Sequence, residues 1–375
     1  MIIGVNARLL LKGKLEGIGY FTQQILQRMT KNHSEDTFVL FFDRKFDESF
    51  VFAKNVVPVV IPCPTRHPLL WKLYFDYLLP IYVKWYKIDV FFSPENYIPK
   101  VKNLPIVCTI HDINFFHNDK YIGSNSHQKY FMRYFPLNAQ RSDRIITVSN
   151  YSKKDIVENF SIDESKIDVV YNAANSIFSP QSKEINQRTK AQYTFGKDYF
   201  YFVGAIHKRK NLVNLFLAYD EFKRRTNSDV KLVVVGNKKW WQGEIEDTYN
   251  DMQYKDDVVF TGRLDAREVS YIASASLGLV FPSLFEGFGI PVVEAFATQT
   301  PVLTSNTTAL DEVAGDAALK VNPYSVEEIT NGMIKIYEDA DFCQSLIAKG
   351  IERNKAFSWE NSSEKLWNIL HKLGK

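Results

Sequence analysis

Short apolar runs alternate with amphipathic stretches in two similar series, one in each half of the chain. Such runs are typical of buried strands, and apolar residues at helical spacing indicate helices. In the first half we expect strands at residues 2–6, 37–42, 56–61, 90–93, 106–110, 144–148 and 167–170, and helices at 20–29 and 152–159. In the second half we expect strands at 199–203, 230–235, 258–261, 277–281, 301–305 and 318–321, and helices at 214–224, 265–275, 291–297 and 325–338.

Strands that alternate with helices favour parallel sheets covered by helices on both faces. We therefore predict an α/β protein with two Rossmann-like, doubly wound domains. The length of 375 residues is also too great for one ordinary core. Residues 171–197, rich in Asn, Ser and Gln, contain the expected boundary. Ligands bind beyond the carboxyl ends of such strands, so two facing domains would form a cleft. Residues 361–373 read as a helix that the pattern alone does not place.

Composition and charge exclude several classes of protein. With 45% apolar and 24% charged residues the chain is globular, and a net charge of +3 is too small to argue for a nucleic-acid partner. Residues 1–175 carry 22 Lys and Arg against 17 Asp and Glu, which suits either an anionic partner or ordinary solubility. The three cysteines have no disulfide or metal-ligand spacing. We expect no signal peptide, no membrane span and a cytoplasmic location.

The stretch FPSLFEGFGIPVVEAFA, residues 281–297, is the most informative motif. Gly287 and Gly289 permit a tight turn before a helix, and the free N–H groups of such a turn form an anion site. Glu286 and Glu294 are out of place beside an anion unless the ligand also presents hydroxyl groups, since a carboxylate accepts hydrogen bonds. A nucleotide sugar has both features. The alternative is a helix-capping Glu and a surface Glu.

Basic residues follow the first strand of the second half in VGAIHKRKN, residues 203–211. The strand ends at Gly204, and Lys208, Arg209 and Lys210 precede a helix, where cations can hold a diphosphate. The alternative is a solvated run of charges.

Two motifs of the first half also follow predicted strands. Gly17 and Gly19 open a helix after the first strand, although a lone G-x-G also fits a simple turn. His111 directly follows the predicted strand 106–110 and is either a site residue or a hydrogen-bonded core histidine. There is no G-x-S-x-G elbow for a serine hydrolase, and neither glycine loop completes the dinucleotide fingerprint G-x-G-x-x-G.

Together these motifs resemble one family, the retaining glycosyltransferases of family 4 with the GT-B fold. The resemblance is carried by VFPSLFEGFGIPVVEAFATQTPVLTSN, residues 280–306, in which seven residues separate Glu286 from Glu294. It extends over nearly the whole chain through GIGYFTQQIL, TVSNYSKKDI, VVYNAANSIFSP and KNLVNLFLAY. The sequence is most similar to mannosyltransferase-like members that build bacterial surface polysaccharides.

The resemblance implies the following function. The enzyme would be a hexosyltransferase that moves a sugar, with mannose from GDP-mannose as the best candidate, to a hydroxyl of a growing glycan or lipid-linked acceptor. The pathway would be O-antigen, capsule or exopolysaccharide synthesis. Alternatives on the same fold are a nucleotide-sugar epimerase and a non-catalytic nucleotide-sugar-binding module. Residues 1–175 would form the acceptor-binding domain with a C-terminal helix, 358–375, that crosses back to it. Residues 176–357 would bind the donor.

The resemblance also assigns roles to residues. Glu294 would bind the ribose, Glu286 a hydroxyl of the transferred sugar, and His111 would face that sugar near its anomeric centre. Lys210 and Arg209 would neutralise the diphosphate. The remaining donor-binding residues would be Gly17, Gly19, Gly204, Gly262, Arg263, Leu264, Gly287, Phe288, Gly289 and Ile290.

Two residues depart from the family pattern. Many members have Arg where Ala205 stands, so Arg209 would have to compensate, and many have Gly at the position of Thr300. We expect no metal and no cofactor, because protein cations would balance the diphosphate and no Asp-x-Asp pair is present near the site.

Residues 67–87, HPLLWKLYFDYLLPIYVKWYK, mix aromatic, apolar and basic side chains. They fit either contact with an anionic membrane that carries the acceptor, at the inner face of the plasma membrane, or a buried helix pair broken by Pro80.

Overall fold

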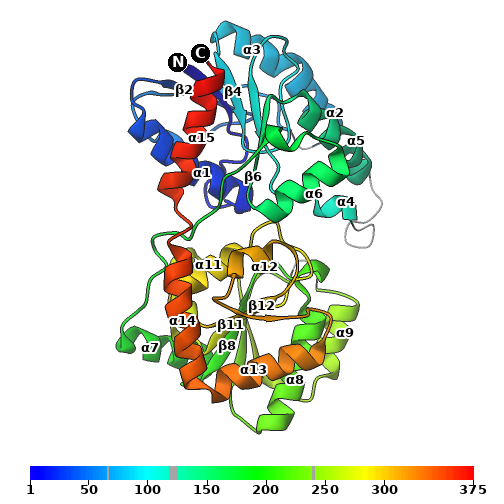
Figure 1. Cartoon of the computed structure of the whole chain (residues 1–375), viewed down its shortest axis with the longest axis vertical. Helices are drawn as coiled ribbons and strands as arrows, with labels where there is room; N and C mark the ends of the chain where they lie inside the picture. The colour runs from blue at the N-terminus through cyan, green and yellow to red at the C-terminus, as the bar shows by residue number, and fades with distance from the viewer. Residues whose placement is uncertain (66, 118–125, 239–240) are drawn as a thin grey trace. The chain divides into compact units, whose positions relative to one another are not determined.

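The computed structural model describes residues 1–65, 67–117, 126–238 and 241–375 (Figure 1). The chain forms two compact units, one made of Met1–Asn172 with Ser358–Lys375 and the other of Ala173–Phe357. From the sequence we expected residues 1–175 with 358–375 to form one domain and residues 176–357 to form the other.

The first unit is built on a seven-stranded parallel sheet in the order β3-β2-β1-β4-β5-β6-β7. The strands are β1 (Ile2–Asn6), β2 (Thr37–Phe42), β3 (Val56–Val60), β4 (Val90–Ser93), β5 (Ile106–Thr109), β6 (Arg144–Thr147) and β7 (Ile167–Val169). The helices are α1 (Gly17–Asn32), α2 (Pro68–Leu73), α3 (Leu79–Trp85), α4 (Asn114–His117), α5 (Ser126–Arg141), α6 (Asn150–Phe160) and α15 (Trp359–Leu373).

The second unit has a six-stranded parallel sheet in the order β10-β9-β8-β11-β12-β13. Its strands are β8 (Tyr199–Val203), β9 (Lys231–Val235), β10 (Val258–Gly262), β11 (Gly278–Phe281), β12 (Val302–Ser305) and β13 (Leu319–Val321). Its helices are α7 (Lys183–Thr194), α8 (Leu212–Thr226), α9 (Glu244–Asp251), α10 (Ala266–Ala275), α11 (Ile290–Ala297), α12 (Thr308–Ala314), α13 (Val326–Glu338) and α14 (Ala340–Asn354).

Both sheets are doubly wound, which confirms the predicted fold class. Their strands are apolar along almost their whole length, as in TFVLFF of β2 and KLVVV of β9, because helices cover both faces. In each unit the strand order reverses between two neighbouring central strands, β1 and β4 in the first and β8 and β11 in the second. This reversal is the topological switch point, where open α/β sheets bind ligands beyond the carboxyl ends of their strands.

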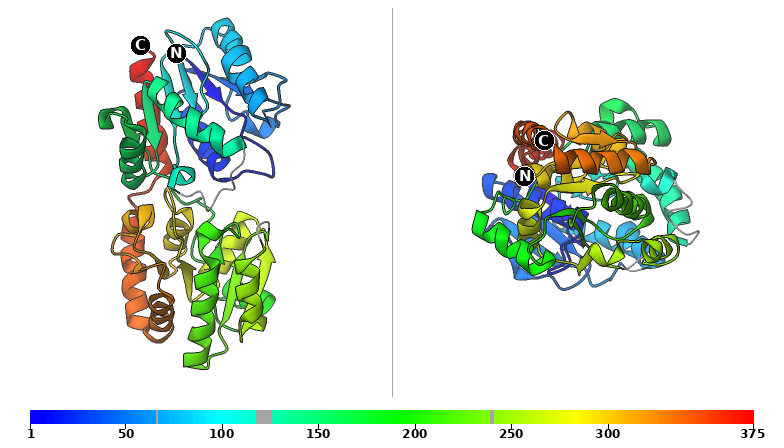
Figure 2. Two further views of the ribbon diagram at one scale, coloured as in Figure 1. Left: turned by 90° about the vertical axis from the view of Figure 1, so that its right-hand side faces the viewer. Right: turned by 90° about the horizontal axis from the view of Figure 1, so that it is seen from below.

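The C-terminal helix α15 belongs to the first unit, as predicted, and runs beside α1 (Figure 1). Leu366 and Leu370 are fully buried, and the Trp367 ring stacks on His33 with centroids 3.7 Å apart. The Trp367 Nε1 also donates to Asp36, 2.8 Å away. The chain therefore ends close to where it begins, and both termini lie at one end of the first unit (Figure 2).

The segment 67–87 is not the buried helix pair that the sequence allowed. α2, a π-helical turn at Tyr74–Leu78 and α3 form one continuous helical run, and Pro80 lies inside this run, directly after the π-helical turn. One face, which includes Trp71, Phe75 and Leu79, is buried in the core of the unit. The opposite face carries exposed apolar side chains. In the part of the chain that the structure describes, no helix is long and apolar enough to cross a membrane.

We predict that α15 contributes a large share of the stability of the first unit. Leu366→Ala removes a fully buried side chain of this helix and should lower the free energy of unfolding by about 2–5 kcal/mol. Lys365→Ala, on the exposed face of the same helix, should have little effect. Urea denaturation followed by tryptophan fluorescence measures both, and equal stability of the two variants would contradict the prediction.

Candidate functional site

Two loops of the second unit converge at its switch point. The chain leaves β8 at Gly204 and forms a short 3₁₀ turn, Lys208–Lys210, before α8. It leaves β11 at Phe281 and makes a turn that enters α11 at Ile290. Since β8 and β11 are parallel neighbours, both loops lie at the same edge of the sheet. The backbone joins them directly, because the N–H of Leu284 donates to the carbonyl of Arg209 at 2.9 Å.

An ion-pair cluster connects these loops. The carboxylate of Glu286 is 2.6 Å from Lys210 Nζ through Oε1 and 2.8 Å from Arg209 Nη1 through Oε2. Arg209 also donates to the carbonyl of Phe285 at 2.6 Å, and Lys210 Nζ lies 4.7 Å from the centre of the Phe281 ring. Burial opposes ionisation of Glu286, but the two cations outweigh it and hold its pKa at about 2. Glu286 is therefore charged at neutral pH and paired with the two cations that the sequence singled out.

The turn from Gly287 to Gly289 presents backbone rather than side chains. Gly289, the residue before α11, has a φ of +107°, and a Cβ atom there would lie 2.6 Å from Leu310 Cδ2. Only glycine fits this conformation and contact. Phe288 turns its buried ring against Phe357, with the ring centres 5.4 Å apart. No side chain of a described residue caps the first turn of α11, which begins at Ile290 with Pro291 next.

Glu294 lies on α11, one helical turn beyond Ile290, and is half-buried. Its carboxyl group makes no hydrogen bond or ion pair with the residues that the structure describes. Burial raises the pKa of Glu294 to about 8. The carboxyl is therefore largely protonated at neutral pH, and it can both donate and accept a hydrogen bond. The sequence allowed a capping Glu and a surface Glu as alternatives. In the described structure the residue that precedes α11 is Gly289, the Glu286 carboxylate pairs with cations, and Glu294 is half-buried.

The remaining donor-binding candidates of the second unit border the same edge of the sheet. Gly204 ends β8, and its N–H donates to the carbonyl of Val235 at 2.9 Å. Gly262 ends β10, two strands from β8, and accepts from the N–H of Gly236 at 2.9 Å. Arg263 is exposed and Leu264 is half-buried.

His111 of the first unit follows β5, as predicted. Its Nε2 is 3.0 Å from the carbonyl oxygen of Pro94. Because a carbonyl only accepts, the imidazole proton is on Nε2 and Nδ1 is left as an acceptor. Burial lowers the pKa of His111, so the ring is neutral. The Phe21 ring of α1 meets it edge-on, with centroids 5.0 Å apart.

Gly17 and Gly19 form the first turn of α1, so the helix reading of this motif is correct. A Cβ atom on Gly19 would lie 2.6 Å from the carbonyl oxygen of Leu9, in the loop that follows β1. A glycine is therefore required for this close approach of helix and loop, whereas Gly17 has open space around it.

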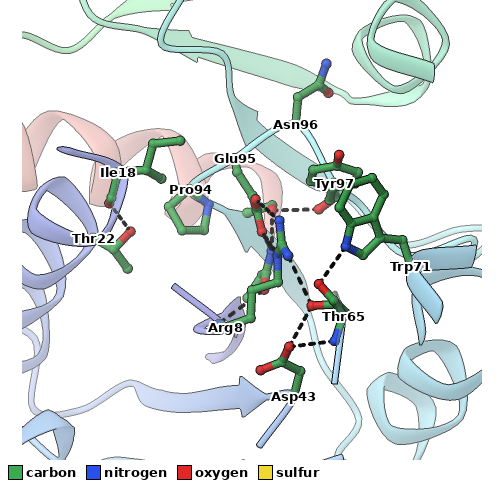
Figure 3. Close-up of polar contacts among 12 residues, drawn as sticks. Arg8, Ile18, Thr22, Asp43, Thr65, Trp71, Pro94, Glu95, Asn96 and Tyr97 are labelled. Atoms are coloured by element: carbon green, nitrogen blue, oxygen red, sulfur yellow. Dashed lines mark hydrogen bonds and ion pairs between the residues drawn. The ribbon is translucent and has the colours of Figure 1, made fainter. Parts of the chain in front are cut away.

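The sequence analysis missed a buried polar cluster at the switch point of the first unit (Figure 3). Arg8, just after β1, forms an ion pair with Glu95, just after β4, and both side chains are almost fully buried. Asn6 donates to the same carboxylate at 2.7 Å. The signal was present in the strings IIGVNAR and VFFSPEN, in which charged residues follow closely after apolar strands.

Among the described residues, no three or more His, Cys, Asp or Glu side chains are grouped in a way that could hold a metal ion. That no metal takes part in the chemistry stays a prediction.

Comparison with known proteins adds an independent line of evidence. The family model described as Glycosyltransferase Family 4 matches residues 15–176, and that of Glycosyl transferases group 1 matches residues 184–353. O-antigen chain mannosyltransferase B of Escherichia coli is 26% identical over 97% of this chain and 98% of its own length. O-antigen chain mannosyltransferase RfbU of Salmonella typhimurium is 29% identical over 74% of each chain.

Among solved structures, sucrose-phosphate synthase from Thermosynechococcus elongatus superposes with a TM-score of 0.80, covering 99% of this chain and 98% of that one. At 17% sequence identity this likeness concerns the fold alone.

We predict that Glu294 makes the protein less stable as the pH rises. Its carboxyl has a pKa of about 8 in the folded protein against an ordinary value of 4.5, so the folded state binds the proton more tightly. The contribution of this group to the free energy of unfolding is fully present below pH 4.5 and is lost as the pH rises through 8. Between pH 5 and pH 9 the free energy of unfolding of Glu294→Gln should therefore rise, relative to that of the wild type, by at least about 1.4 kcal/mol.

Urea denaturation at the two pH values measures this gain. Glu338→Gln, which changes an exposed Glu of α13, is the control and should follow the wild type. A gain equal to that of the control would contradict the prediction.

Proposed function

The chain belongs to glycosyltransferase family 4 and has the GT-B fold, and on this premise we propose that it transfers mannose from GDP-mannose to a glycan hydroxyl. As a glycosyltransferase it binds a sugar donor and an acceptor. We propose that the acceptor is a growing or lipid-linked glycan of a bacterial surface polysaccharide and that the transferred sugar retains its anomeric configuration. The choice of mannose and of this pathway is supported by the two relatives, both of which are named as O-antigen chain mannosyltransferases.

The observation that carries the proposal is the cluster of Lys210, Arg209 and Glu286 at the switch point. When a glycosidic bond to a diphosphate breaks, negative charge develops on the leaving group. Cations and N–H groups already in place stabilise that charge without reorganisation, and each such donor typically contributes about 3 kcal/mol. Lys210, Arg209 and the amides of residues 287–289 would serve as these donors. Arg209 would then compensate for Ala205.

The two acids would bind hydroxyl groups in different ways. Glu286 is ionised, so it can accept from a hydroxyl of the transferred sugar while it stays paired with a cation. Glu294 is protonated and without a partner among the described residues, so it can both donate to and accept from the ribose hydroxyls. The nucleobase would lie against Gly262, Arg263 and Leu264.

We propose that the reaction needs no metal or other cofactor, since Lys210 and Arg209 carry the positive charge that a divalent cation would otherwise supply. In a front-face reaction with retention, the leaving phosphate takes the proton of the acceptor hydroxyl. His111 would then act as a hydrogen-bond acceptor for a sugar hydroxyl through Nδ1, and Gly17 and Gly19 would allow backbone approach to the diphosphate.

We expect GDP-mannose to bind more tightly than UDP-glucose in calorimetry and to yield an α-linked mannosyl product with a mannose-terminated acceptor. Lys210→Ala should lower turnover at least about a hundredfold, because it removes one preorganised cation. Lys208→Ala is the matched control, since this exposed lysine in the same turn makes no ion pair with a described residue. The anomeric proton–carbon coupling in the product's NMR spectrum gives the configuration.

Three results would contradict the proposal. One is a β-linked product, the second is tighter binding of the uridine donor, and the third is normal turnover in Lys210→Ala. Isomerisation of the donor without acceptor would instead identify an epimerase.

We further propose that the helical run 68–85 binds an anionic lipid bilayer that carries the acceptor, which would place the enzyme in the cytoplasm against the membrane. Its outer face has apolar side chains every four residues, at Leu69, Leu73, Tyr77, Ile81 and Trp85. Trp85 is 75% exposed and Leu69 is 72% exposed. Three exposed lysines, Lys72, Lys84 and Lys87, accompany the single acid Asp76. An apolar stripe flanked by lysines suits the interface of an anionic membrane.

Flotation with vesicles tests this surface. We expect the wild type to float with vesicles of 70% phosphatidylcholine and 30% phosphatidylglycerol and not with phosphatidylcholine alone. Replacing Leu69, Ile81 and Trp85 together by Ser should abolish flotation. The control is Phe195→Ser, which removes a 90% exposed aromatic ring in the second unit. Undiminished flotation of the triple variant, or none of the wild type, would refute a lipid-binding role.

A further inference from the structure

We propose that the buried ion pair between Arg8 and Glu95 is a positioning device for His111, which it orients by fixing the carbonyl of Pro94. The inference rests on the proposed role of His111 in the reaction. It concerns residues that no part of the family motif singled out. Arg8 and Glu95 would act through His111 and would not touch the substrate.

The pair spans the switch point of the first unit, as Figure 3 shows. Arg8 Nη2 is 2.5 Å from Glu95 Oε2, and Arg8 Nε donates to Oε1 of the same carboxylate, so the contact is bidentate. Asn6, the last residue of β1, adds a third bond to Oε1 at 2.7 Å. The carboxylate of Glu95 is thus held from β1 by three N–H groups in defined directions.

Glu95 is the second residue of the segment 94–105, which joins β4 to β5 and has no regular secondary structure. Each of its first four residues is held by a side-chain bond. The Pro94 carbonyl accepts from His111, Asn96 Nδ2 donates to the carbonyl of Phe135 at 2.8 Å, and Ser93 Oγ donates to the carbonyl of Tyr97 at 2.7 Å. Because such a loop lacks ladder hydrogen bonds, these side chains decide where its carbonyl groups point.

The other side of Arg8 is also held. Its Nη1 donates to Thr65 Oγ1 at 3.0 Å, and that hydroxyl donates to Asp43 at 2.6 Å. The guanidinium also lies over the Tyr97 ring, 4.9 Å from its centre. Burial would lower the pKa of Arg8, but the charge of Glu95 reverses this effect and raises it, so the pair stays charged.

Stability alone is a weak reason for such a pair. Taking two charges out of water is costly, and apolar residues of similar volume often fill the same space without loss of stability. An apolar pair would fill the space but would not fix the orientation of the side chain at position 95. The bidentate contact fixes both the position and the rotation of Glu95, and Pro94 is its covalent neighbour.

The tautomer of His111 depends on the orientation of the Pro94 carbonyl group. The proton stays on Nε2 because the Pro94 carbonyl accepts it there, and this leaves Nδ1 as the acceptor. Phe21 limits the tilt of the ring, and the backbone carbonyl of His111 is 3.3 Å from Ser152 Oγ, which donates to it. If the Pro94 carbonyl turned away, the proton would no longer be confined to Nε2, and a fraction of the molecules would present a donor where an acceptor is needed.

The test uses the double variant Arg8→Met/Glu95→Met, which keeps the volume and removes both charges. Proteins labelled with ¹⁵N-histidine report the tautomer of each ring by NMR, and the His111 signals are assigned by their loss in His111→Gln. For the wild type we expect the proton on Nε2 only. For the double variant we expect a mixture of tautomers, a kcat at least about tenfold lower and a KM for GDP-mannose within about threefold.

Two further variants make the result decisive. Lys223→Met removes a buried cation 2.7 Å from Asp257 in the second unit and should change neither the tautomer nor kcat. Glu95→Gln keeps the side-chain shape and one carbonyl oxygen for Arg8 and Asn6. It should show a smaller change in tautomer and a smaller loss of kcat. It replaces the double variant in the test if that variant does not fold.

The proposal is overturned if the charge-removed variants that fold keep the Nε2 tautomer and normal turnover. A loss of melting temperature without either change would also overturn it, since that is what a purely structural pair predicts. A normal kcat in His111→Gln would instead refute the proposed role of His111. The NMR spectra would still decide whether the ion pair orients the ring.

Discussion

The constraint on which the functional chemistry of this protein depends is the reversal of strand order at the centre of each parallel sheet. Connections leave the two central strands toward opposite faces, so the loops at their carboxyl ends lie side by side at the switch point. In both units a cation that follows the first strand pairs with a glutamate that follows the neighbouring central strand. Arg8 meets Glu95 across β1 and β4, and Lys210 with Arg209 meets Glu286 across β8 and β11. The same topology therefore produces the same kind of ion pair twice.

The two pairs differ in what surrounds them. Glu95 accepts hydrogen bonds from Arg8 and Asn6, and Arg8 also donates to Thr65. The charged groups of this cluster are therefore bonded to side chains of the protein itself. In the second unit the pair borders a turn of backbone N–H groups. One helical turn further lies the carboxyl of Glu294, which has no partner among the described residues. We interpret the first cluster as a support for the neighbouring loop and the second as a place for a charged, hydroxyl-rich ligand.

Glu286 and Glu294 show how neighbours rather than residue type decide charge. Burial opposes the ionisation of both carboxyl groups, and both belong to one short motif. Two cations lower the pKa of Glu286 to about 2, whereas no cation of the described part of the chain pairs with Glu294, and burial raises its pKa to about 8. The motif therefore presents one permanent anion and one protonated carboxyl group. Such a pair can bind two different hydroxyl groups without placing two like charges together.

Periodicity and composition alone determined the strand positions, the α/β class and the loops that carry Lys210, Glu286 and His111, because apolar runs, glycines and charges at strand ends are local features. The ion pair of Arg8 and Glu95 was decided only by the tertiary structure, since its partners are 87 positions apart in the sequence and strand order brings them together. The same holds for residues 67–87, where the core determines which face is buried. It also holds for the protonation of Glu294, because a pKa depends on the burial and charges around a group, which no local pattern specifies.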